Sequence, residues 1–385
     1  MRLLIISHTP HYLRDGEIVG WGATVREIDE LATLFDSVTH IAPLYPEAAP
    51  ASAMAYRSSC VRLRAVAPAG GERFRDKLSI ALRYPGYARA ILQERRAADV
   101  IHVRAPANIS LLALVMLAVL RRPKIRWAKY AGDWSGGLGE PWAYRFQRWW
   151  LARGFHRGVV TVNGRWQKQP AHVHSFLNPC LTETELGKGA EASRRKKLCQ
   201  PVQLLFVGRL ESAKGAGICL DILAHLERAG IAAHLDLVGD GEERPQFEQQ
   251  AQDLRVAPRV RFHGGLPRDA LGRFYELAHF ILLPSDSEGW PKVLSEAMAY
   301  GAVPIASAVG SIPEYLADFS TGSAIRSRDS RLFSDAIESY LRVPSCWDEH
   351  SGNAVRAAQQ FSYGNYLRAV RELLMLPVVA EQAVA

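Results

Sequence analysis

Cysteine is scarce in this sequence, and long apolar runs are absent. The five cysteines in 385 residues are odd in number and form no CxxC pair, so the sequence predicts neither a zinc site nor a disulfide framework. A reducing compartment such as the cytoplasm is the simplest expectation. The longest uncharged apolar stretch, Leu111–Leu120, is about half of the roughly 20 residues that a membrane-spanning helix needs. The N-terminal run Leu3–Ile6 is too short for the core of a signal peptide.

Acidic residues are under-represented in the first half of the chain. Residues 1–190 carry 26 Lys and Arg against 15 Asp and Glu, a net charge of +11, whereas residues 191–385 carry 21 against 24, a net charge of −3. The isoelectric point near 9.3 raises nucleic-acid binding as a function, but no helix-turn-helix, RNP or zinc-finger signature supports it. We therefore predict no nucleic-acid partner.

Short β-rich apolar runs alternate with stretches of helical periodicity. This alternation predicts parallel sheets with helices on both faces, and the chain length indicates two such α/β domains. A polar stretch without strand character separates them, so we predict domains at residues 1–183 and 201–361 with a linker at 184–200. The predicted strands are Leu3–Ser7, Ser37–Ala42, Val100–Val103, Arg126–Tyr130, Val159–Val162, Gln203–Val207, His234–Val238, Val260–Phe262, Phe280–Leu283 and Ala302–Ala306.

Loops that follow strands are the candidate sites, because open parallel sheets bind ligands beyond the carboxyl ends of their strands. Residues 8–22 form the first such loop, and a helix is predicted to begin near Thr24. Gly20 and Gly22 can bring backbone N–H groups close to a phosphate, or they can simply shape a turn.

The second candidate loop is FVGRLESAKG, residues 206–215. Gly208 allows a turn, and Arg209 and Lys214 can face one anion or remain solvated surface cations. The spacing fits neither a Walker loop nor a GxGxxG fingerprint. A companion loop at 238–244 carries Gly239 and Gly241, where a nucleotide could approach the backbone or the chain could merely turn.

The third and most informative segment is LLPSDSEGWPKVLSEAMAYGAVPIA, residues 282–306. Pro291 can open a helix and Gly301 can close it. Glu288 then lies in the loop before the helix and Glu296 lies on it, with seven residues between them. Small and apolar neighbours predict a packed helix, so the carboxylate of Glu296 needs a partner and could accept hydrogen bonds from a ribose diol.

The loop at residues 206–215, the companion loop at 238–244, the segment 282–306 and the sequence VGSIPEYL follow one another along the chain. In this order they resemble the donor-binding half of family 4 retaining glycosyltransferases of the GT-B fold. The spacing of Glu288 and Glu296 matches the E-x7-E motif of that family, and the series extends from Leu204 to Leu316. The resemblance implies two facing Rossmann-like domains, an acceptor-binding one and a donor-binding one. It also implies that residues 362–385 form a helix that crosses back to the first domain.

The resemblance implies roles for individual residues. Arg209 and Lys214 would neutralise the donor diphosphate, Glu296 would bind the ribose, and Glu288 would contact hydroxyls of the transferred sugar. No metal or other cofactor is expected, since the two cations would do the electrostatic work of a metal. The implied donor-binding residues are Gly20, Gly22, Gly208, Arg209, Lys214, Gly239, Gly241, Glu288, Gly289, Trp290, Pro291, Val293 and Glu296, with Asp133 as a further catalytic candidate.

One departure from the family concerns a His–Asp pair after a middle strand of the first domain. Here the stretch KYAGDWSGG has Gly132 where the family has His, whereas Asp133 fits. Either Asp133 positions the sugar, or the sugar is held differently; His8, His11 and His102 are candidate substitutes, and each can equally be structural. Trp290 stands where smaller residues are expected and is predicted to shape the sugar pocket.

The first half also contains seven of the nine tryptophans. The segments 72–96 and 145–158 are basic and aromatic. They can form a surface that contacts anionic lipid at the inner face of the cell membrane, or their tryptophans can be core residues and their arginines solvated. We expect a UDP- or GDP-linked hexose donor and a glycan or lipid-linked acceptor, in polysaccharide or glycolipid biosynthesis. The alternatives are a sugar-nucleotide epimerase, a non-catalytic sugar-nucleotide-binding protein and a glycogen-type phosphorylase. The phosphorylase is disfavoured because no cofactor-lysine motif is found.

Overall fold

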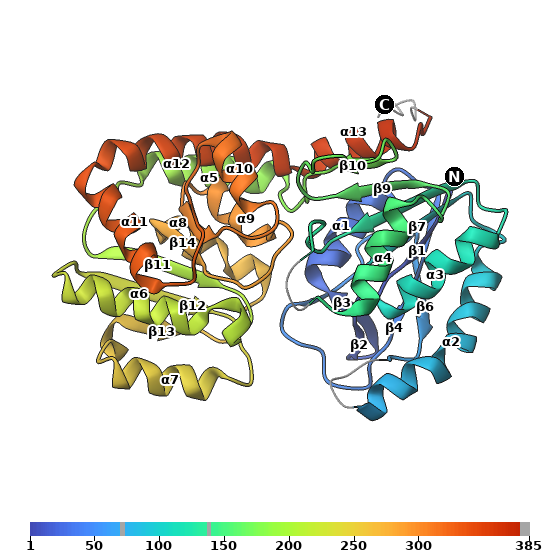
Figure 1. Ribbon diagram of the computed structural model, residues 1–385, viewed down its shortest axis with the longest axis horizontal. Helices are drawn as coiled ribbons and strands as arrows, with labels where there is room; N and C mark the ends of the chain where they lie inside the picture. The colour runs from blue at the N-terminus through green and yellow to red at the C-terminus, as the bar shows by residue number, and fades with distance from the viewer. Residues whose placement is uncertain (70–73, 137–139, 378–385) are drawn as a thin grey trace. The chain divides into compact units, whose positions relative to one another are not determined.

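Two compact units divide the chain. The computed structural model describes residues 1–69, 74–136 and 140–377, and is drawn in Figure 1. Unit 1 comprises Met1–Phe176 together with the chain from Gly364 onward, and unit 2 comprises Leu177–Tyr363. The chain therefore returns to its first unit at the end, as the resemblance to GT-B proteins implied. Residues 72–73 of the basic segment and residues 378–385 of the predicted last helix lie outside the described residues.

Unit 1 contains a parallel sheet in the order β10-β9-β8-β7-β1-β4-β6. The chain runs outward from β1 in one direction and then, from β7, in the other, so the strand order reverses between these two strands. The strands are β1 (Arg2–Ile6), β4 (Ser37–Pro43), β6 (Val61–Val66), β7 (Val100–Ala105), β8 (Ile125–Tyr130), β9 (Val159–Val162) and β10 (Val173–Ser175).

Helices cover both faces of this sheet because alternate residues of its strands are apolar on opposite sides. Leu3 and Ile5 pack on the face that α1 and α13 cover, whereas Leu4 and Ile6 pack on the face that α2, α3 and α4 cover. The helices are α1 (Gly22–Ala32), α2 (Phe74–Glu94), α3 (Asn108–Val119), α4 (Trp142–Ala152) and α13 (Tyr363–Leu373).

Unit 2 repeats this plan with a parallel sheet in the order β13-β12-β11-β14-β15-β16. One face packs against α6, α7 and α11, and the other against α5, α8, α9, α10 and part of α12. Its elements are β11 (Val202–Val207), β12 (Ala233–Val238), β13 (Val260–Phe262), β14 (Phe280–Leu283), β15 (Val303–Ser307), β16 (Ser323–Ile325), α5 (Glu183–Arg195), α6 (Ala216–Arg228), α7 (Arg244–Asp253), α8 (Gly272–Leu277), α9 (Lys292–Ala299), α10 (Ile312–Phe319), α11 (Ser330–Arg342), α12 (Pro344–Ala358) and the 3-10 turns η1 (Ser212–Lys214), η2 (Ala257–Arg259), η3 (Arg268–Ala270) and η4 (Gln359–Phe361).

All the predicted strands are present, but the predicted loop at residues 8–22 is in large part a β-hairpin. Strands β2 (His11–Arg14) and β3 (Glu17–Trp21) pair in antiparallel fashion, and β3 also pairs with β5 (Ala53–Ala55). The turn consists of Asp15 and Gly16, both with positive φ. Asp-Gly is a strong hairpin signal, because both central residues of such a turn need the left-handed conformation.

The predicted linker at residues 184–200 is largely helical and belongs to unit 2, because it contains most of α5. A capping box begins this helix: Thr182 Oγ1 accepts a hydrogen bond from the Glu185 backbone N–H at 3.2 Å, and Glu185 Oε2 accepts one from the Thr182 N–H at 2.8 Å. The Thr-x-x-Glu spacing is the sequence signal for such a start, and it lies in the polar stretch that we interpreted as a linker.

Among the described residues, no helix has the length and apolar character to cross a membrane.

A buried polar chain ties the hairpin to the sheet of unit 1. His11 Nδ1 lies 2.9 Å from the carbonyl oxygen of Thr9, so this nitrogen carries the proton and the Nε2 of the neutral ring accepts from the Tyr56 hydroxyl at 2.9 Å. His40 Nδ1 lies 2.7 Å from the Tyr56 oxygen and His40 Nε2 lies 2.7 Å from Ser7 Oγ, which also donates to Thr9 Oγ1 at 2.8 Å.

Burial keeps both rings neutral. It lowers the pKa of His11 to about 4 and, with the nearby charges of His11, Arg104 and His102, lowers the pKa of His40 well below its usual value. A histidine whose pKa is lower in the folded state binds fewer protons than in the unfolded chain. Its contribution to stability is therefore complete above about pH 6.5 and is lost as the pH falls below that value.

We predict that the chain loses stability between pH 6.5 and pH 5, by about 2 kcal/mol for His11 and by a further amount for His40, whose pKa is also lowered. The variant His40→Gln is expected to melt at a lower temperature than the wild type at pH 7, because it disrupts the buried chain. Its further loss on acidification should be smaller, since one proton uptake is removed. Melting temperatures of both proteins at pH 7 and pH 5 test this; equal losses in both would contradict it.

Candidate functional site

The strand order of unit 2 reverses between β11 and β14, and the loops that follow these strands meet there. Gly215, after η1, has φ +84, and a Cβ on it would collide with the carbonyl oxygen of Pro284. The Asp286 N–H donates to the Ala213 carbonyl at 2.9 Å. A crevice at a strand-order reversal is where open α/β sheets bind their ligands.

Lys214 and Glu288 face each other across this junction. The ammonium Nζ of Lys214 donates to Glu288 Oε1 at 2.7 Å, and both side chains keep part of their surface exposed. Lys214 directly precedes the N-terminus of α6, where the helix dipole also favours a bound anion. The structure thus brings together two of the predicted site residues, which are separated by 74 positions.

Arg328, from the loop after β16, braces the same junction. Its guanidinium donates to the Pro284 carbonyl at 3.0 Å and to the Ser212 carbonyl at 2.6 Å, and it pairs with Asp286. Ser212 is also held from the other side, because its N–H donates to Glu243 at 3.1 Å. Sequence reasoning missed the roles of Arg328 and Glu243. Each of these side chains binds backbone groups that are distant along the chain, so no local motif marks it.

The glycines of the two neighbouring loops are required by close packing. A Cβ on Gly239 would collide with the Gly208 carbonyl, and a Cβ on Gly241 would collide with the Leu210 carbonyl. Arg209 stands between these contacts with a side chain that is 71% exposed and pairs with Glu211 at 2.6 Å. It is the more accessible of the two predicted phosphate-binding cations.

Glu296 lies on α9, buried as predicted, and has partners at both carboxylate oxygens. The Tyr275 hydroxyl donates to Oε2 at 2.7 Å, and the Arg268 guanidinium pairs with Oε1. Arg268 also donates to Glu185 at 3.3 Å and to the Cys180 carbonyl at 3.1 Å. Sequence reasoning missed Arg268 and Tyr275, because neither lies in a candidate loop and each meets Glu296 only in the folded chain.

Electrostatics explain why this buried cluster remains charged. Burial lowers the pKa of the Arg268 guanidinium, but the carboxylates of Glu296 and Glu185 outweigh this and raise it. Burial, together with the negative charge of Glu296, raises the pKa of Tyr275 well above its usual value, so the phenol keeps its proton as a donor. Since each carboxylate oxygen can accept more than one hydrogen bond, Glu296 keeps capacity for a further donor.

Trp290 does not shape an open pocket in this structure, contrary to our expectation. Its side chain is 2% exposed, stacks on Phe361 at 5.2 Å and donates from Nε1 to Ser295 Oγ at 2.7 Å. The indole is a core residue that anchors the loop from the inside. Val293 packs partly on the same core, and Pro291 is the N-cap of α9.

The loop backbone is clamped from the outside as well. A Cβ on Gly310 would collide with the Glu288 carbonyl, and the Gly289 carbonyl accepts from Ser311 N at 3.1 Å and from Ser311 Oγ at 2.9 Å. The positions of Glu288 and Gly289 are therefore set by backbone packing on both sides.

The predicted site residues of unit 1 lie at the carboxyl ends of its strands or in the hairpin. A Cβ on Gly20 would lie 2.7 Å from the His11 ring, and one on Gly22 would lie 2.5 Å from the Ser52 carbonyl, so both glycines are needed for packing. Asp133, after β8, accepts from Ser135 N at 2.9 Å and from Ser135 Oγ at 2.7 Å within its own loop.

The three substitute histidines differ in exposure. His11 and His102 are buried in unit 1, and the His102 ring lies against Trp127 with a centroid distance of 3.7 Å, so both are structural. His8 is exposed. Across residues 1–69, 74–136 and 140–377, no group of three or more His, Cys, Asp or Glu is arranged to hold a metal ion.

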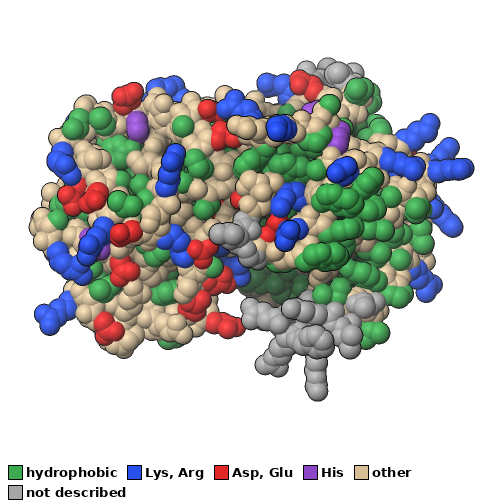
Figure 2. Space-filling model, viewed as in Figure 1, with side chains coloured by type: hydrophobic (Ala, Val, Ile, Leu, Met, Phe, Trp, Pro, Cys, Tyr) green, Lys and Arg blue, Asp and Glu red, His purple; other side chains and the backbone are tan. Residues whose placement is uncertain are grey.

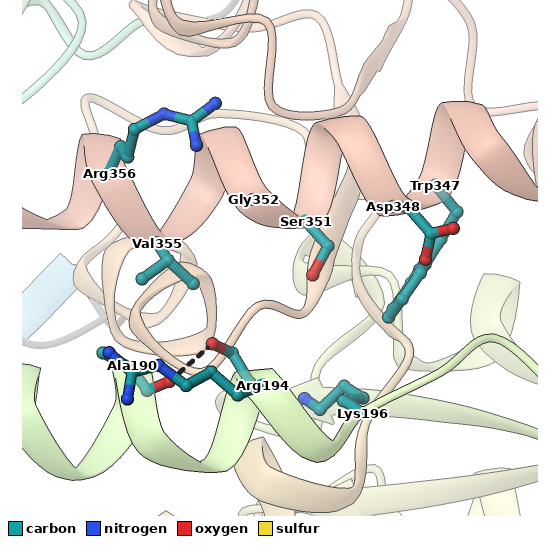
Figure 3. A pocket seen from close by; sticks show the side chains of 10 residues that line it. Ala190, Arg194, Lys196, Trp347, Asp348, Ser351, Gly352, Val355 and Arg356 are labelled. Carbon is teal, nitrogen blue, oxygen red and sulfur yellow. Dashed lines mark hydrogen bonds between the residues drawn. The ribbon is translucent and has the colours of Figure 1, made fainter.

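A separate pocket of about 360 Å³ lies between α5 and α12 in unit 2 (Figure 3). Lys196 on its wall donates to the carbonyls of Tyr275 and Ala278, both at 2.8 Å, and burial lowers the pKa of its amine to about 7. None of the predicted site residues lines this pocket.

Comparison with known structures defines the class of fold. Sucrose-phosphate synthase from Thermosynechococcus elongatus superposes with a TM-score of 0.74 at 18% identity, over 97% of this chain and 98% of that one. HepE from Anabaena, solved in complex with UDP and glucose, gives a TM-score of 0.69 at 16% identity, over 97% and 99%. The chain has the GT-B fold of glycosyltransferases.

The sequence comparisons match the second unit of the chain to glycosyltransferases. Residues 190–361 match the family described as "Glycosyl transferases group 1". D-inositol 3-phosphate glycosyltransferase from Frankia alni is 31% identical over 176 residues, 43% of this chain and 43% of that protein. The chain matches about half the length of its curated relatives. The matched family segment contains the Lys214–Glu288 pair and the Glu296 cluster.

The environment of Trp290 leads to a prediction about stability. The variant Trp290→Ala should lower the free energy of unfolding by about 3–5 kcal/mol, because it leaves a cavity against Phe361. Trp290→Phe should retain much of this stability, since the ring still stacks. Chemical denaturation of the three proteins measures the difference. An unchanged stability for Trp290→Ala would show that the indole is not a core group and would restore the sugar-pocket interpretation.

Proposed function

We propose that this protein is a retaining, metal-independent glycosyltransferase that moves a hexose from a nucleoside diphosphate to an acceptor hydroxyl. The observation that carries the proposal is the junction of β11 and β14, where Lys214 pairs with Glu288 beside the N-terminus of α6. A partly exposed ammonium at such a helix start suits a phosphate group. The family match of residues 190–361 supports this interpretation.

In this proposal the donor replaces protein groups as partners of the two cations. Phosphate oxygens take the place of Glu288 on Lys214 and of Glu211 on Arg209, and Glu288 becomes free to accept hydrogen bonds from sugar hydroxyls. Glu296, kept in place by Arg268 and Tyr275, accepts from the ribose hydroxyls. Gly208, Gly239 and Gly241 let the nucleotide approach the backbone.

The chemistry needs no protein nucleophile. The bond between the anomeric carbon and the diphosphate oxygen breaks while the acceptor oxygen bonds to that carbon on the same face. The acceptor proton passes to a donor phosphate oxygen. Arg209 and Lys214 stabilise the negative charge that grows on the leaving diphosphate, which is the main electrostatic demand of the reaction.

The donor and the acceptor are assigned on separate grounds. HepE was solved with UDP and glucose, which supports a UDP-linked hexose as the donor ahead of a GDP-linked one. We assign the acceptor to unit 1, where Asp133 is the catalytic candidate, and keep Gly20 and Gly22 of the same unit as candidates for binding the donor. The basic character of this half suits a glycan or lipid-linked acceptor in polysaccharide or glycolipid synthesis, on the cytoplasmic side of the cell membrane.

A sugar-nucleotide epimerase and a non-catalytic sugar-nucleotide-binding protein are the alternatives on the same fold. An epimerase isomerises its sugar nucleotide without any acceptor, and a binding protein leaves it unchanged. Lys214, which we propose binds phosphate, pairs with Glu288, which we propose binds the sugar. This arrangement favours sugar transfer over the two alternatives.

Lys214→Ala is expected to lower turnover at least about tenfold, which corresponds to roughly 1.4 kcal/mol of transition-state stabilisation. Its melting temperature should remain close to that of the wild type, because Lys214 is partly exposed and the Glu288 carboxylate that it leaves behind still reaches solvent. Lys188→Ala, which removes an exposed cation on α5, is the matched control and should keep full turnover. A turnover loss below tenfold with an unchanged melt would contradict the phosphate role.

Glu296→Gln is expected to reduce both donor binding and transfer. Glutamine is the better test, because alanine would leave the Arg268 charge buried without its partner. A UDP-hexose at 100 times its dissociation constant should stabilise the wild type by about 2.7 kcal/mol. The variant should lose most of this shift, and Glu276→Gln, an exposed acid on α8, should keep it. Unchanged transfer by Glu296→Gln would overturn the assignment, and isomerised donor without acceptor would identify an epimerase.

A further inference from the structure

One face of unit 1 exposes an aromatic stripe along α4. At 100° per residue, Trp142, Phe146 and Trp149 lie on the side opposite the buried residues Gln147 and Leu151. Trp142 is 72% exposed and Trp149 is 47% exposed. These indoles are neither core residues nor isolated surface groups, and the helix turns its largest apolar side chains outward.

The aromatic rings form a continuous layer. Phe146 lies 5.5 Å from Trp142 and 5.7 Å from Trp149, and Phe155, in the turn after the helix, lies 5.4 Å from Trp149 and 4.9 Å from Trp150. Such contacts hold the rings in place without covering their outer faces. The layer is therefore a preformed apolar surface.

Helix α3 extends this surface. Trp150 Nε1 donates to the Leu114 carbonyl of α3 at 3.2 Å, so the two helices are in direct contact. Val119, at the end of α3, is 79% exposed, and Val115 is exposed as well. Figure 2 shows hydrophobic side chains gathered over the part of unit 1 where Figure 1 places α3 and α4. Contiguous apolar patches of this kind mark binding surfaces.

The exposed charged residues of α4 and of the segments that follow α3 and α4 are basic. After α3, Arg121, Arg122 and Lys124 are exposed. Arg145 lies on the outward side of α4, and Arg153 and Arg157 follow the helix, all three with exposed side chains. Glu140, which precedes α4, pairs with Arg148. A partner that matches such a face has an anionic surface with an apolar interior beneath it.

We propose that the face formed by α3, α4 and Phe155 docks on a bilayer that contains anionic lipid. Tryptophan settles at the boundary between headgroups and acyl chains, whereas arginine binds the headgroups and lets its stem lie along apolar surface. A nucleic acid would match the arginines but not the exposed valines of α3. The inference extends the sugar transfer proposed above, and only its purpose, access to a lipid-linked acceptor, rests on that proposal.

Flotation of the full chain with vesicles tests this surface in the absence of any donor. The chain should float with vesicles of phosphatidylcholine mixed equally with phosphatidylglycerol and should stay behind with phosphatidylcholine alone. The double variant Arg145→Glu/Arg153→Glu should bind at least about tenfold more weakly, since each basic residue near an anionic surface contributes several-fold. Trp142→Ser/Trp149→Ser should also bind at least about tenfold more weakly, because it removes the apolar contact.

Two variants in unit 2 serve as matched controls for this experiment. Leu277→Ser removes an exposed apolar side chain on α8, and Arg331→Glu reverses an exposed charge on α11. Both should float like the wild type, and melting temperatures confirm that every variant is folded. Lys214→Ala should keep vesicle binding while it loses turnover, which separates this inference from the proposed activity.

Several outcomes would overturn the inference. Wild-type protein that ignores both vesicle types, or that binds phosphatidylcholine alone equally well, contradicts it. So does wild-type binding by the tryptophan variant. A lipid-free dimer that the tryptophan variant abolishes would assign the face to a second copy of the chain.

Discussion

The close approach of the loops after β11 and β14 is the constraint on which the proposed donor site depends. No side chain fits between Gly215 and the carbonyl of Pro284, and Arg328 ties both loops to one guanidinium. Because the backbone is so close, a lysine side chain from one loop reaches a glutamate in the other. The site is therefore built by backbone packing first and by charge second.

The two acids of the E-x7-E pair differ in burial and in their hydrogen-bond and ion-pair partners. Glu296 is buried and receives a permanent cation and a permanent phenol, so its orientation does not depend on any ligand. Glu288 is more accessible, and its partner Lys214 is the same cation that the proposed diphosphate would use. One acid can thus act as a fixed hydrogen-bond acceptor, whereas the other can exchange partners when a ligand arrives.

The alternating apolar runs predicted the parallel sheets well, because a strand buried on both faces leaves a strong local signal. The hairpin at residues 11–21 and helix α5 were missed, although Asp15–Gly16 and Thr182-x-x-Glu185 are known local signals. In both cases a glycine-rich or polar composition outweighed the local signal. Short edge strands such as β10 and β16 carry too few residues for a reliable pattern.

The site was predictable where it rests on spacing along the chain. Glu288 and Glu296 were found from seven intervening residues, and the burial of Glu296 from its small apolar neighbours. The side chains that position them could not be found in this way, because Arg268, Tyr275 and Arg328 meet their partners only through the tertiary fold. Trp290 shows the opposite error, since a large side chain in a site loop can turn inward and support the loop.

The division of the chain also constrains the order of synthesis. Tyr366 and Val370 of α13 complete the same core as Leu3 and Ile5 of β1, so unit 1 combines residues that are synthesised before unit 2 with residues that are synthesised after it. Unit 2 is a continuous segment and is complete before α13 is synthesised. The N-terminal unit is therefore the last to finish folding, and a polypeptide that stops after Phe176 leaves an apolar face of its sheet uncovered.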